Sequence, residues 1–540
     1  MRAFTIAALL TVGCTSPSTP EGTPTLDVTS PARGSTSDSN QVTVSGTATH
    51  AAQVTVNGKT VAPGADGTFA TTIVLDPGID IIETHAINGS DDVRDVRSVL
   101  SGSLAPTDGS VTSPVAVYAS AAALKSIGSA IGAAAKAIDF TAAVQPLNPV
   151  YDNGGCLGAT IDITNVSVGS IDASLTPTAT ALDTAVTIED VVVTLHASYK
   201  VACLGGSTTI TVKATAAHLG GNLGVKAQSG TVATSVGAVS VALDDFSLDV
   251  GGVPSEIASL FDSVVRGKVE SALTSVIHDK LPAIANKQLA SLVTKPVTAS
   301  ILGTSAAITA AVTDVTLSPT GVYLAIDTTI AVSGGTGAMA LSQPILLTPD
   351  LVDQAPGLGI AIANDAVNQL FGGLWAAGAF DKTLPIASVG PLAAILDPAA
   401  TTLDLQLSLP PTVTSDSAGL ELAIGDLLIT THDDSGAEIQ EVALSLATSV
   451  MTAPSQDGKL VLTVGAPDVH AQVVAQAASV ARPLTDSEVE GIVTSVWTIV
   501  GDTANTALGK LPLPGFGGIE LGAPTITGQV GYVVADIAVP

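Results

Sequence analysis

The longest run of helical periodicity covers residues 254–292. Apolar residues recur there every three or four positions, which places them on one face of a helix that continues over several turns. That face includes Ile257, Leu260, Phe261, Val264 and Val265. Pro282 interrupts the pattern and is expected to kink or end the helix. Because so long an apolar face needs an equally long surface to cover it, the sequence predicts a long helix packed on a sheet.

A second long helix is predicted from about residue 486 to residue 510. Thr485 and Glu488 have the spacing of a capping box, and Leu484 and Val489 have that of a hydrophobic staple, so two signals mark the same helix start. The apolar stripe that follows includes Ile492, Val496 and Trp497. Both long helices therefore offer a continuous apolar face.

Alternating apolar and polar residues precede each long helix, chiefly within residues 159–250 and 306–464. A period of two predicts strands with one apolar face. The order of helix, strands and long helix then occurs twice, which indicates two domains of the same α+β architecture. We place these domains at residues 113–293 and 294–540.

Two shorter helices are predicted at about residues 113–138 and 357–380, where the chain is rich in Ala and Gly. Ser113 is a suitable N-cap for the first of them. The second contains Asn364 and Asp365 among its apolar residues, and this polarity makes it a poor candidate for a membrane span.

Residues 25–101 form a separate all-β unit, with short strands at regular spacing, and residues 102–112 follow as a linker. Asn57-Gly58 supplies the positive φ angles of a tight hairpin, and the whole pattern predicts a β-sandwich. The elements VSGT, VTVNG and DGTF resemble bacterial immunoglobulin-like domains of secreted proteins, although Asp80 stands where such domains often have Asn. The resemblance implies a spacer or adhesive module without chemistry of its own.

The N-terminal segment MRAFTIAALLTVGC has a charged residue, a short apolar run and a small residue before a cysteine. It is too short to span a bilayer and resembles a bacterial lipoprotein signal. The resemblance implies that residues 1–13 are removed, that Cys14 is acylated with palmitate or a similar chain, and that residues 14–24 tether the protein to the outer membrane, facing the periplasm or the surface. Ordinary secretion with an incidental cysteine is the alternative.

The charge of the chain excludes one class of partner. Nineteen Lys and Arg residues against 48 Asp and Glu residues give a formal net charge of −29, so binding of nucleic acid through its phosphates is not expected. Aromatic residues make up only 3% of the chain, and small aliphatic residues dominate the apolar faces. Small side chains can leave an elongated cavity, and a dry cavity favours acyl chains by about 0.8 kcal/mol per buried CH₂.

The remaining polar chemistry is sparse. Cys156 and Cys203 are the two cysteines besides Cys14, and in an exported protein they most simply form a disulfide. The histidines are scattered singly, and neither a nucleophile elbow nor a phosphate loop occurs. Residues 433–436 indicate a hairpin turn in preference to a calcium loop. The sequence therefore predicts no enzymatic activity, no cofactor and no metal.

The order of elements over residues 111–540 resembles the tubular lipid-binding family that includes bactericidal/permeability-increasing protein, lipopolysaccharide-binding protein and cholesteryl ester transfer protein. The segment NDAVNQLFGGLWAAGAFDKTLP resembles the helix that opens the second domain of that family, and LGKLPLPGFGGIELGAPTITGQVGYVVADIAV resembles its closing segment. Cys156 and Cys203 stand where the family has its one disulfide. The resemblance implies two tandem domains, each a highly curved antiparallel sheet wrapped around a long helix. The acidic charge departs from the cationic members, so endotoxin binding is not carried over.

Two functions are compatible with these patterns. The first is a membrane-tethered lipid-binding or lipid-transfer protein, which holds a phospholipid or another acyl lipid in grooves along the two long helices. The alternative is a non-enzymatic structural or adhesive lipoprotein of the surface, with ordinary filled cores. The sequence names neither the lipid nor a protein partner.

Overall fold

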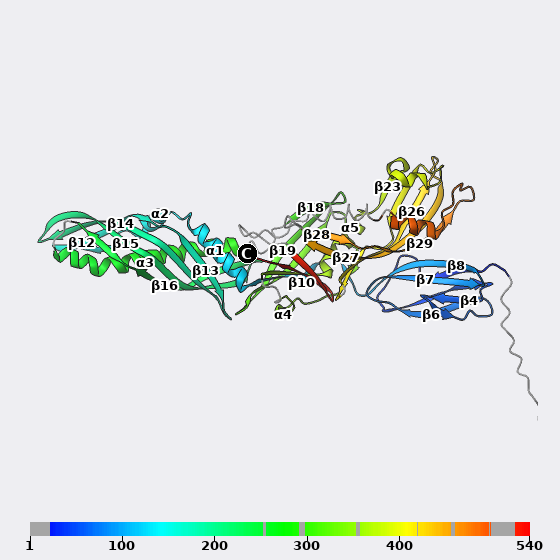
Figure 1. Cartoon of the computed structure of the whole chain (residues 1–540), viewed down its shortest axis with the longest axis horizontal. Coiled ribbons are helices and arrows are strands. Elements are labelled where there is room, and N and C mark those ends of the chain that lie inside the picture. The colour runs from blue at the N-terminus through cyan, green and yellow to red at the C-terminus, as the bar shows by residue number, and fades with distance from the viewer. Residues whose placement is uncertain are drawn as a thin grey trace, which may run out of the picture.

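Curled antiparallel sheets follow one another along an elongated molecule, one of them beside a long helix, and the N-terminal β-domain lies beside its C-terminal half (Figure 1). The structure is a computed structural model. It describes residues 22–251, 255–290, 297–352, 357–417, 419–454, 460–495, 497 and 524–539. The expected signal peptide, Cys14 and the predicted helix beyond residue 497 therefore lie outside the described residues.

The N-terminal domain is a sandwich of two sheets. One sheet orders β1 (Thr25–Ser30), β3 (Gln41–Thr49) and β6 (Thr68–Val74), and the other orders β2 (Ser35–Ser37), β8 (Asp91–Ser101), β7 (Gly78–Asn88), β4 (Gln53–Val56) and β5 (Lys59–Val61). Val44 and Phe69 of the first sheet pack in one core with Val54 and Ile82 of the second. The predicted Asn57-Gly58 hairpin is confirmed, because both residues have positive φ angles between β4 and β5.

Asp80, the residue that replaces the usual Asn, is a weak point of this domain. Its carboxylate accepts hydrogen bonds from the Asp76 N–H at 3.2 Å and from the Ser101 hydroxyl at 3.0 Å. Burial nevertheless raises the pKa of Asp80 to about 6. The folded domain thus binds a proton more tightly than the unfolded chain does, and its stability falls as the pH rises from about 4 through about 6.

We expect Asp80→Asn to stabilise the N-terminal domain at pH 7 by about 1–2 kcal/mol, after allowance for the partial exposure of the carboxylate. The Asn carbonyl keeps the acceptor for Asp76 but carries no charge that burial opposes. Thermal unfolding of the full chain between pH 4 and pH 8 checks this. The variant is expected to lose the stability decline across that range, and an unchanged decline would show that Asp80 is not its source.

A curled antiparallel sheet forms the half of the molecule that is far from the N-terminal domain (Figure 1). It orders β11 (Tyr151–Asn153), β12 (Leu157–Ser167), β14 (Leu182–Val201), β15 (Leu204–Gln228) and β16 (Thr231–Asp244), with β13 (Ile171–Pro177) also on β14 and β17 (Ser247–Val250) on β15. Buried and exposed residues alternate along β14, so one face is apolar as the period of two predicts. Cys156 and Cys203 are joined, which confirms the predicted disulfide.

The predicted first long helix is confirmed as α3 (Ser255–Leu289), which packs with α1 (Ala121–Ala135) inside this sheet. The helix continues through Pro282 instead of ending there. The carbonyl of Pro282 accepts a hydrogen bond from the Thr234 hydroxyl at 3.3 Å, and Asn286 accepts one from the Thr234 N–H at 2.7 Å. These contacts with β16 support the helix at the proline and one turn after it. Two short helical turns, α2 (Phe140–Val144) and η1 (Gln145–Leu147), connect α1 to the sheet.

The two shorter helices begin later than the sequence predicts. Residues 110–120 form strand β10, and α1 starts after Ser120, whose hydroxyl accepts a hydrogen bond from the Ala123 N–H at 3.3 Å. The prediction of Ser113 as N-cap was therefore wrong. Likewise β22 (Leu358–Ala363) precedes α5 (Asn364–Ala376). Pairing of both segments within one sheet outweighs their small-residue composition, because intrinsic preferences are weak beside tertiary hydrogen bonds and packing.

That sheet is central and draws on distant parts of the chain. Its order is β18 (Val297–Ile301), β19 (Thr304–Ser318), β20 (Gly321–Val332), β10, β22, β31 (Tyr532–Ile537) and β30 (Pro524–Gln529). A small sheet beside it pairs β9 (Leu104–Pro106) of the expected linker with β21 (Met339–Leu341). The domain limits set from sequence stay a prediction, since strands from both proposed domains share the central sheet.

A second curled sheet completes the C-terminal half. It orders β23 (Lys382–Pro385), β24 (Thr402–Leu407), β26 (Gly419–His432), β27 (Glu438–Pro454) and β28 (Leu460–Val464), with β25 (Thr412–Asp416) also on β26 and β29 (Asp468–Gln476) on β27. The 3₁₀ turns η3 (Ile386–Ser388) and η4 (Gly390–Ala394) connect β23 to β24, and the short α4 (Pro349–Val352) lies by the central sheet. The hairpin predicted at residues 433–436 joins β26 to β27: Asp433 accepts hydrogen bonds there from the N–H groups of Ser435 and Ala437.

Helix α5 fastens the central sheet to this second curled sheet. The Asn368 side chain pairs with the backbone of β25 as a neighbouring strand would: it donates to the Val413 carbonyl at 3.0 Å and accepts from the Val413 N–H at 2.7 Å. The Asn364 side chain donates to the Ser415 hydroxyl of the same strand at 2.9 Å. The polar residues that argued against a membrane span are thus buried hydrogen-bonding groups of a tertiary contact. In the described residues no single helix has the length and apolar content to cross a membrane. The helical segments 121–135 and 140–147 have that length and apolar content only when they are taken together, and they are bent by 84° where they meet.

Candidate functional site

An apolar cavity of about 240 Å³ lies between the second curled sheet and the segments that cover it. Thirteen of its fifteen lining residues are aliphatic, and none is charged. The lining residues are Leu384, Val389, Leu392, Ile395, Leu396, Leu403, Leu405, Ile429, Thr431, Gln440, Val442, Leu484, Val489, Ile492 and Val493. A lining of this composition favours an apolar occupant over water, because water needs polar partners to replace the hydrogen bonds of the bulk liquid.

Two cross-strand rows on β24, β26 and β27 form the floor of the cavity. In one row Leu405 is paired with Ile429, and Ile429 with Val442. In the other row Leu403 is paired with Thr431, and Thr431 with Gln440. Residues that are directly opposite on neighbouring strands point to the same face of a sheet, so the register alone brings these six side chains together.

The roof comes from two further segments. The helix at residues 486–495 contributes Val489, Ile492 and Val493, whose spacing of three and four positions puts them on one face. The turns between β23 and β24 contribute Val389 and Leu392, with Ile395 and Leu396 directly after them. Thr485 and Glu488 start the helix: the Thr485 N–H donates to the Glu488 carboxylate at 2.9 Å, and the Glu488 N–H donates to the Thr485 hydroxyl at 3.4 Å. The predicted capping box is therefore confirmed.

The two polar residues of the lining, Thr431 and Gln440, form hydrogen bonds within the protein. The Thr431 hydroxyl donates to the Gln440 carbonyl at 3.3 Å. The Gln440 amide donates to the Leu484 carbonyl at 3.1 Å and to the Gln476 side chain at 3.3 Å. Because these donors are satisfied, the cavity offers a ligand mainly dispersion contacts and removal from water, which suits an alkyl chain and not a polar substrate.

Two of the three candidate residues of the second long helix are described, and they lie at or near this cavity. Ile492 lines it. Trp497 packs with Val489 in the adjoining cluster, and its indole N–H donates to the Gly465 carbonyl at 2.7 Å. Val496 lies outside the described residues.

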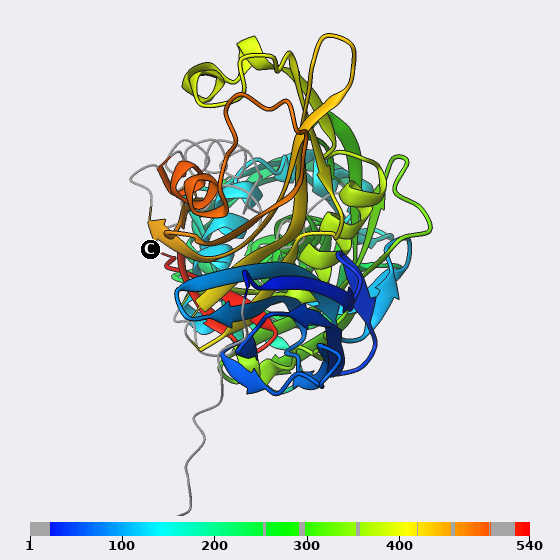
Figure 2. The same ribbon diagram turned by 90° about the vertical axis from the view of Figure 1, so that its right-hand side faces the viewer.

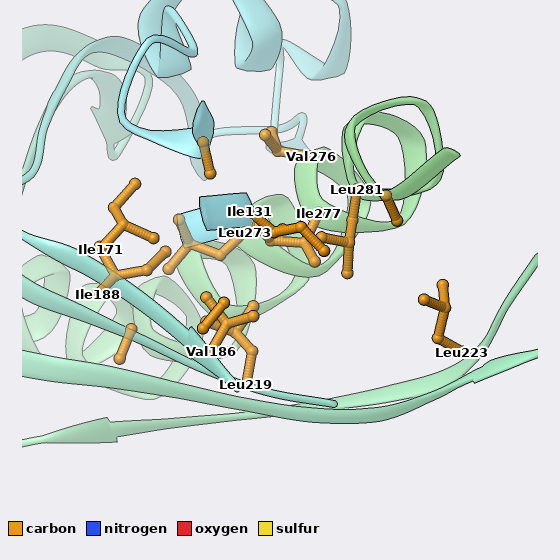
Figure 3. Packing of buried hydrophobic residues seen from close by; sticks show 14 of the residues in the cluster. Ile131, Ile171, Val186, Ile188, Leu219, Leu223, Leu273, Val276, Ile277 and Leu281 are labelled. Carbon is orange, nitrogen blue, oxygen red and sulfur yellow. The ribbon is translucent and has the colours of Figure 1, made fainter. Parts of the chain in front are cut away.

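The candidate residues of the first long helix have different surroundings. Phe261 is 0% exposed and Val265 is 1% exposed, both within the large packed cluster of the first curled sheet, while Val264 is half-buried. The side chains of Ile257 and Leu260 are outside the described residues. Figure 3 shows how Leu273 and Ile277 of α3 face Ile131, Val186 and Leu219 at close range.

The gap that borders the second half of α3 is small. A gap of about 10 Å³ borders Ile277 and Leu281, which is too small for an acyl chain. α1 fits just as closely on the sheet, since a Cβ at Gly128 would come within 2.9 Å of the Ala173 carbonyl oxygen. A lipid-binding role for the α3 face stays a prediction, and the structure offers an apolar space in the second half instead.

The sequence did not predict that the floor residues, or the roof residues at 389–396, form part of a site. The signal for the floor was present, since Leu403 and Leu405, and Ile429 and Thr431, alternate with residues of the opposite face. Alternation shows which face of a strand is apolar, but it does not show which cross-strand rows lie beneath a covering segment. The run PLAAIL at residues 391–396 was a second signal, because so apolar a connection between strands needs something to cover.

Other hollows of the molecule have different chemistry. An open crevice of about 930 Å³ lies where the N-terminal domain meets the central sheet, and its walls carry Asp76, Ser342, Ser415 and Glu421. These polar and charged groups alternate with apolar residues such as Ile345 and Val530, unlike the uncharged aliphatic lining of the cavity above. In the part of the chain that the structure describes, no group of three or more His, Cys, Asp or Glu side chains is placed to hold a metal ion.

Comparison with known proteins separates the N-terminal domain from the rest. Residues 24–99 match the family model of glucodextranase domain B, an immunoglobulin-like domain. The chain is similar to the crystal structure of lipopolysaccharide binding protein at 14% identity and a TM-score of 0.45, which covers 80% of this chain and 99% of that one. It is also similar to P47 of Clostridium botulinum E1, at 6% identity and a TM-score of 0.24, over 79% of this chain and 99% of that one.

A third similar structure is latherin, at 19% identity and a TM-score of 0.19, over 31% of this chain and 84% of that one. No curated protein sequence matches the chain. These structural similarities are low, and the function has to be argued from the cavity.

Proposed function

We propose that this protein is a non-enzymatic lipid-binding protein that holds an acyl chain in the apolar cavity of its C-terminal half. The observation that carries the proposal is the lining: thirteen aliphatic residues, no charge, and two polar side chains already hydrogen-bonded within the protein. Each CH₂ that enters such a space contributes about 0.8 kcal/mol, so part of one acyl chain is enough for useful affinity.

The cellular setting of this proposal comes from the sequence. The lipoprotein-like signal supports acylation of Cys14 and tethering to the outer membrane. The net charge of −29 favours a zwitterionic or neutral lipid over a polyanionic one. A tether and an acyl site together suit a protein that takes up lipid at a membrane or delivers lipid to it.

A structural or adhesive role is the second candidate. The observation that favours it is the first half of the molecule, where described side chains of α3 and α1 pack in one buried cluster and the gap beside Ile277 and Leu281 is about 10 Å³. In that case the cavity beneath residues 486–495 is a packing defect with no occupant. The two candidates differ in one measurable respect, which is bound lipid.

We expect organic extraction of the full-length protein, purified from its native envelope, to release about one acyl lipid per chain, as counted by mass spectrometry. An unrelated control protein of the size of the N-terminal domain, processed in the same way, should release no lipid. After delipidation, a fluorescent fatty-acyl probe should rebind with the same stoichiometry. Absence of both bound lipid and probe binding would exclude lipid binding and leave the structural role. The same spectra report the N-terminal peptide, and an unmodified Cys14 would refute the tether.

A further inference from the structure

The N-terminal domain is docked on the C-terminal half, and the contact reaches the cavity. Figure 2 shows the domain against the strands of the second curled sheet. The Gln472 side-chain oxygen on β29 accepts from the Val96 N–H at 2.8 Å and from the Arg33 guanidinium at 2.6 Å. Ser98 of β8 is hydrogen-bonded to Ser445 of β27 at 2.7 Å. These contacts fix β8 against β27 and β29, which is not the arrangement of a free spacer.

Arg94, also on β8, reaches from the N-terminal domain to the helix that roofs the cavity. Its guanidinium is 2.7 Å from the Glu490 carboxylate and 3.5 Å from that of Asp486. It also pairs with Glu83 of its own domain at 3.4 Å and donates to the Ala471 carbonyl on β29. Arg94 therefore joins three elements: the N-terminal domain, β29 and the roof helix.

The roof helix has two faces with different tasks. Asp486 and Glu490, one turn apart, face Arg94, whereas Val489 and Val493 face the cavity. The same carboxylates accept hydrogen bonds from the sheet: Asp486 from the Val473 N–H at 2.7 Å and Glu490 from the Ala471 N–H at 3.1 Å. A change in the position of this turn would therefore move the apolar roof with it.

The ion pairs around Arg94 are partly shielded from solvent. The side chains of Arg94, Glu490 and Asp486 are 20%, 24% and 29% exposed. Burial of the guanidinium opposes its charge, but the hydrogen bond that it donates to Glu490 and the nearby carboxylates outweigh this and raise the pKa of Arg94. Partial burial and a shared guanidinium make these pairs stronger than isolated surface pairs, and loss of the cation leaves two carboxylates one turn apart without a positive charge beside them.

We propose that Arg94 is a positioning residue for the acyl site, and that through it the N-terminal domain holds residues 486–495 closed over the cavity and controls uptake and release of the ligand. This rests on the proposed function of the cavity. The N-terminal domain thereby gains a task in ligand exchange that its similarity to a spacer module does not suggest.

The test compares Arg94→Met with wild type in the full chain. Met keeps much of the apolar stem of Arg but not its charge. We expect an acyl probe to leave the variant about tenfold faster, with a smaller change in the number of sites. Backbone amides of residues 486–495 should exchange hydrogen faster, with or without lipid. High salt should move wild type toward the variant, because the pairs are partly exposed and salt screens them.

Arg266→Met is the matched control. Arg266 pairs with Glu270 at 3.1 Å on α3, in the other half of the molecule, and its loss should leave probe release unchanged. Equal probe release and equal amide exchange in Arg94→Met and wild type would overturn the positioning role. If wild type binds no probe, the proposed function fails by itself. Amide exchange at residues 486–495 still decides whether Arg94 holds the helix.

Discussion

Val442→Trp is expected to weaken binding of a fatty-acyl probe by at least about tenfold, while the thermal stability of the lipid-free protein changes little. Val442 lies at the end of the Leu405, Ile429, Val442 row, in the floor of the cavity. Val442 is 5% exposed and borders the cavity, so we expect the indole to extend into the cavity and compete there with the ligand. Probe titration and calorimetry of the same preparations measure both quantities.

Val265→Trp is the matched comparison. Val265 is 1% exposed in the packed cluster around α3, so enlargement there forces neighbours apart and should cost about 1–3 kcal/mol or more of stability. Its effect on probe binding should be small if the ligand occupies the C-terminal cavity. The reverse result, with lipid lost in Val265→Trp and kept in Val442→Trp, would place the ligand along α3, as the sequence pattern predicts. Val442→Leu provides a milder step, should the Trp variant fail to fold.

Arg33→Met is expected to destabilise the contact between the N-terminal domain and the C-terminal half by about 3–5 kcal/mol, because it leaves a buried carboxylate without its cation. The Asp426 side chain is 0% exposed and lies 2.7 Å from the Arg33 guanidinium. It also accepts from the backbone N–H groups of Gly34 at 2.9 Å and Ser98 at 2.8 Å. Denaturant unfolding followed by the fluorescence of Trp375 and Trp497, which both lie in the C-terminal half, measures the loss.

The second substitution of this pair separates the charge from the shape of the contact. Asp426→Asn in the Arg33→Met background removes the unpaired charge and keeps an acceptor for the two N–H groups, so it should recover part of the lost stability. A loss below about 1 kcal/mol for Arg33→Met alone would mean that the two domains are held by their other contacts, and that Asp426 tolerates solvent when its partner is gone.

The two arginines act at different places on the same contact. Arg33 holds the domain through β26, where Asp426 lies, whereas Arg94 holds the roof helix. Arg33→Met is therefore expected to affect stability first, and Arg94→Met the rate of ligand exchange first. If docking by itself governs exchange, the two variants would release the probe at similar rates.

Local patterns in the sequence determined a good part of this protein. The period of three to four gave helix α3 and the start of the helix at residue 486, because an amphipathic face is written in consecutive residues. Local hydrogen bonding also gave the Thr485–Glu488 capping box and the turns at Asn57 and Asp433. The disulfide of Cys156 and Cys203 followed from cysteine count and compartment.

Three features were decided by the tertiary structure. β10 and β22 are strands because neighbours far away in sequence pair with them, and that gain exceeds the small difference in intrinsic preference. A cavity of about 240 Å³ lies beneath residues 486–495, whereas the gap beside Ile277 and Leu281 of α3 is about 10 Å³, because cavity volume depends on how facing side chains fit and not on their average size. The N-terminal domain is docked through Arg33 and Arg94, whose partners are hundreds of residues away, so no local pattern could show that these cations are bound.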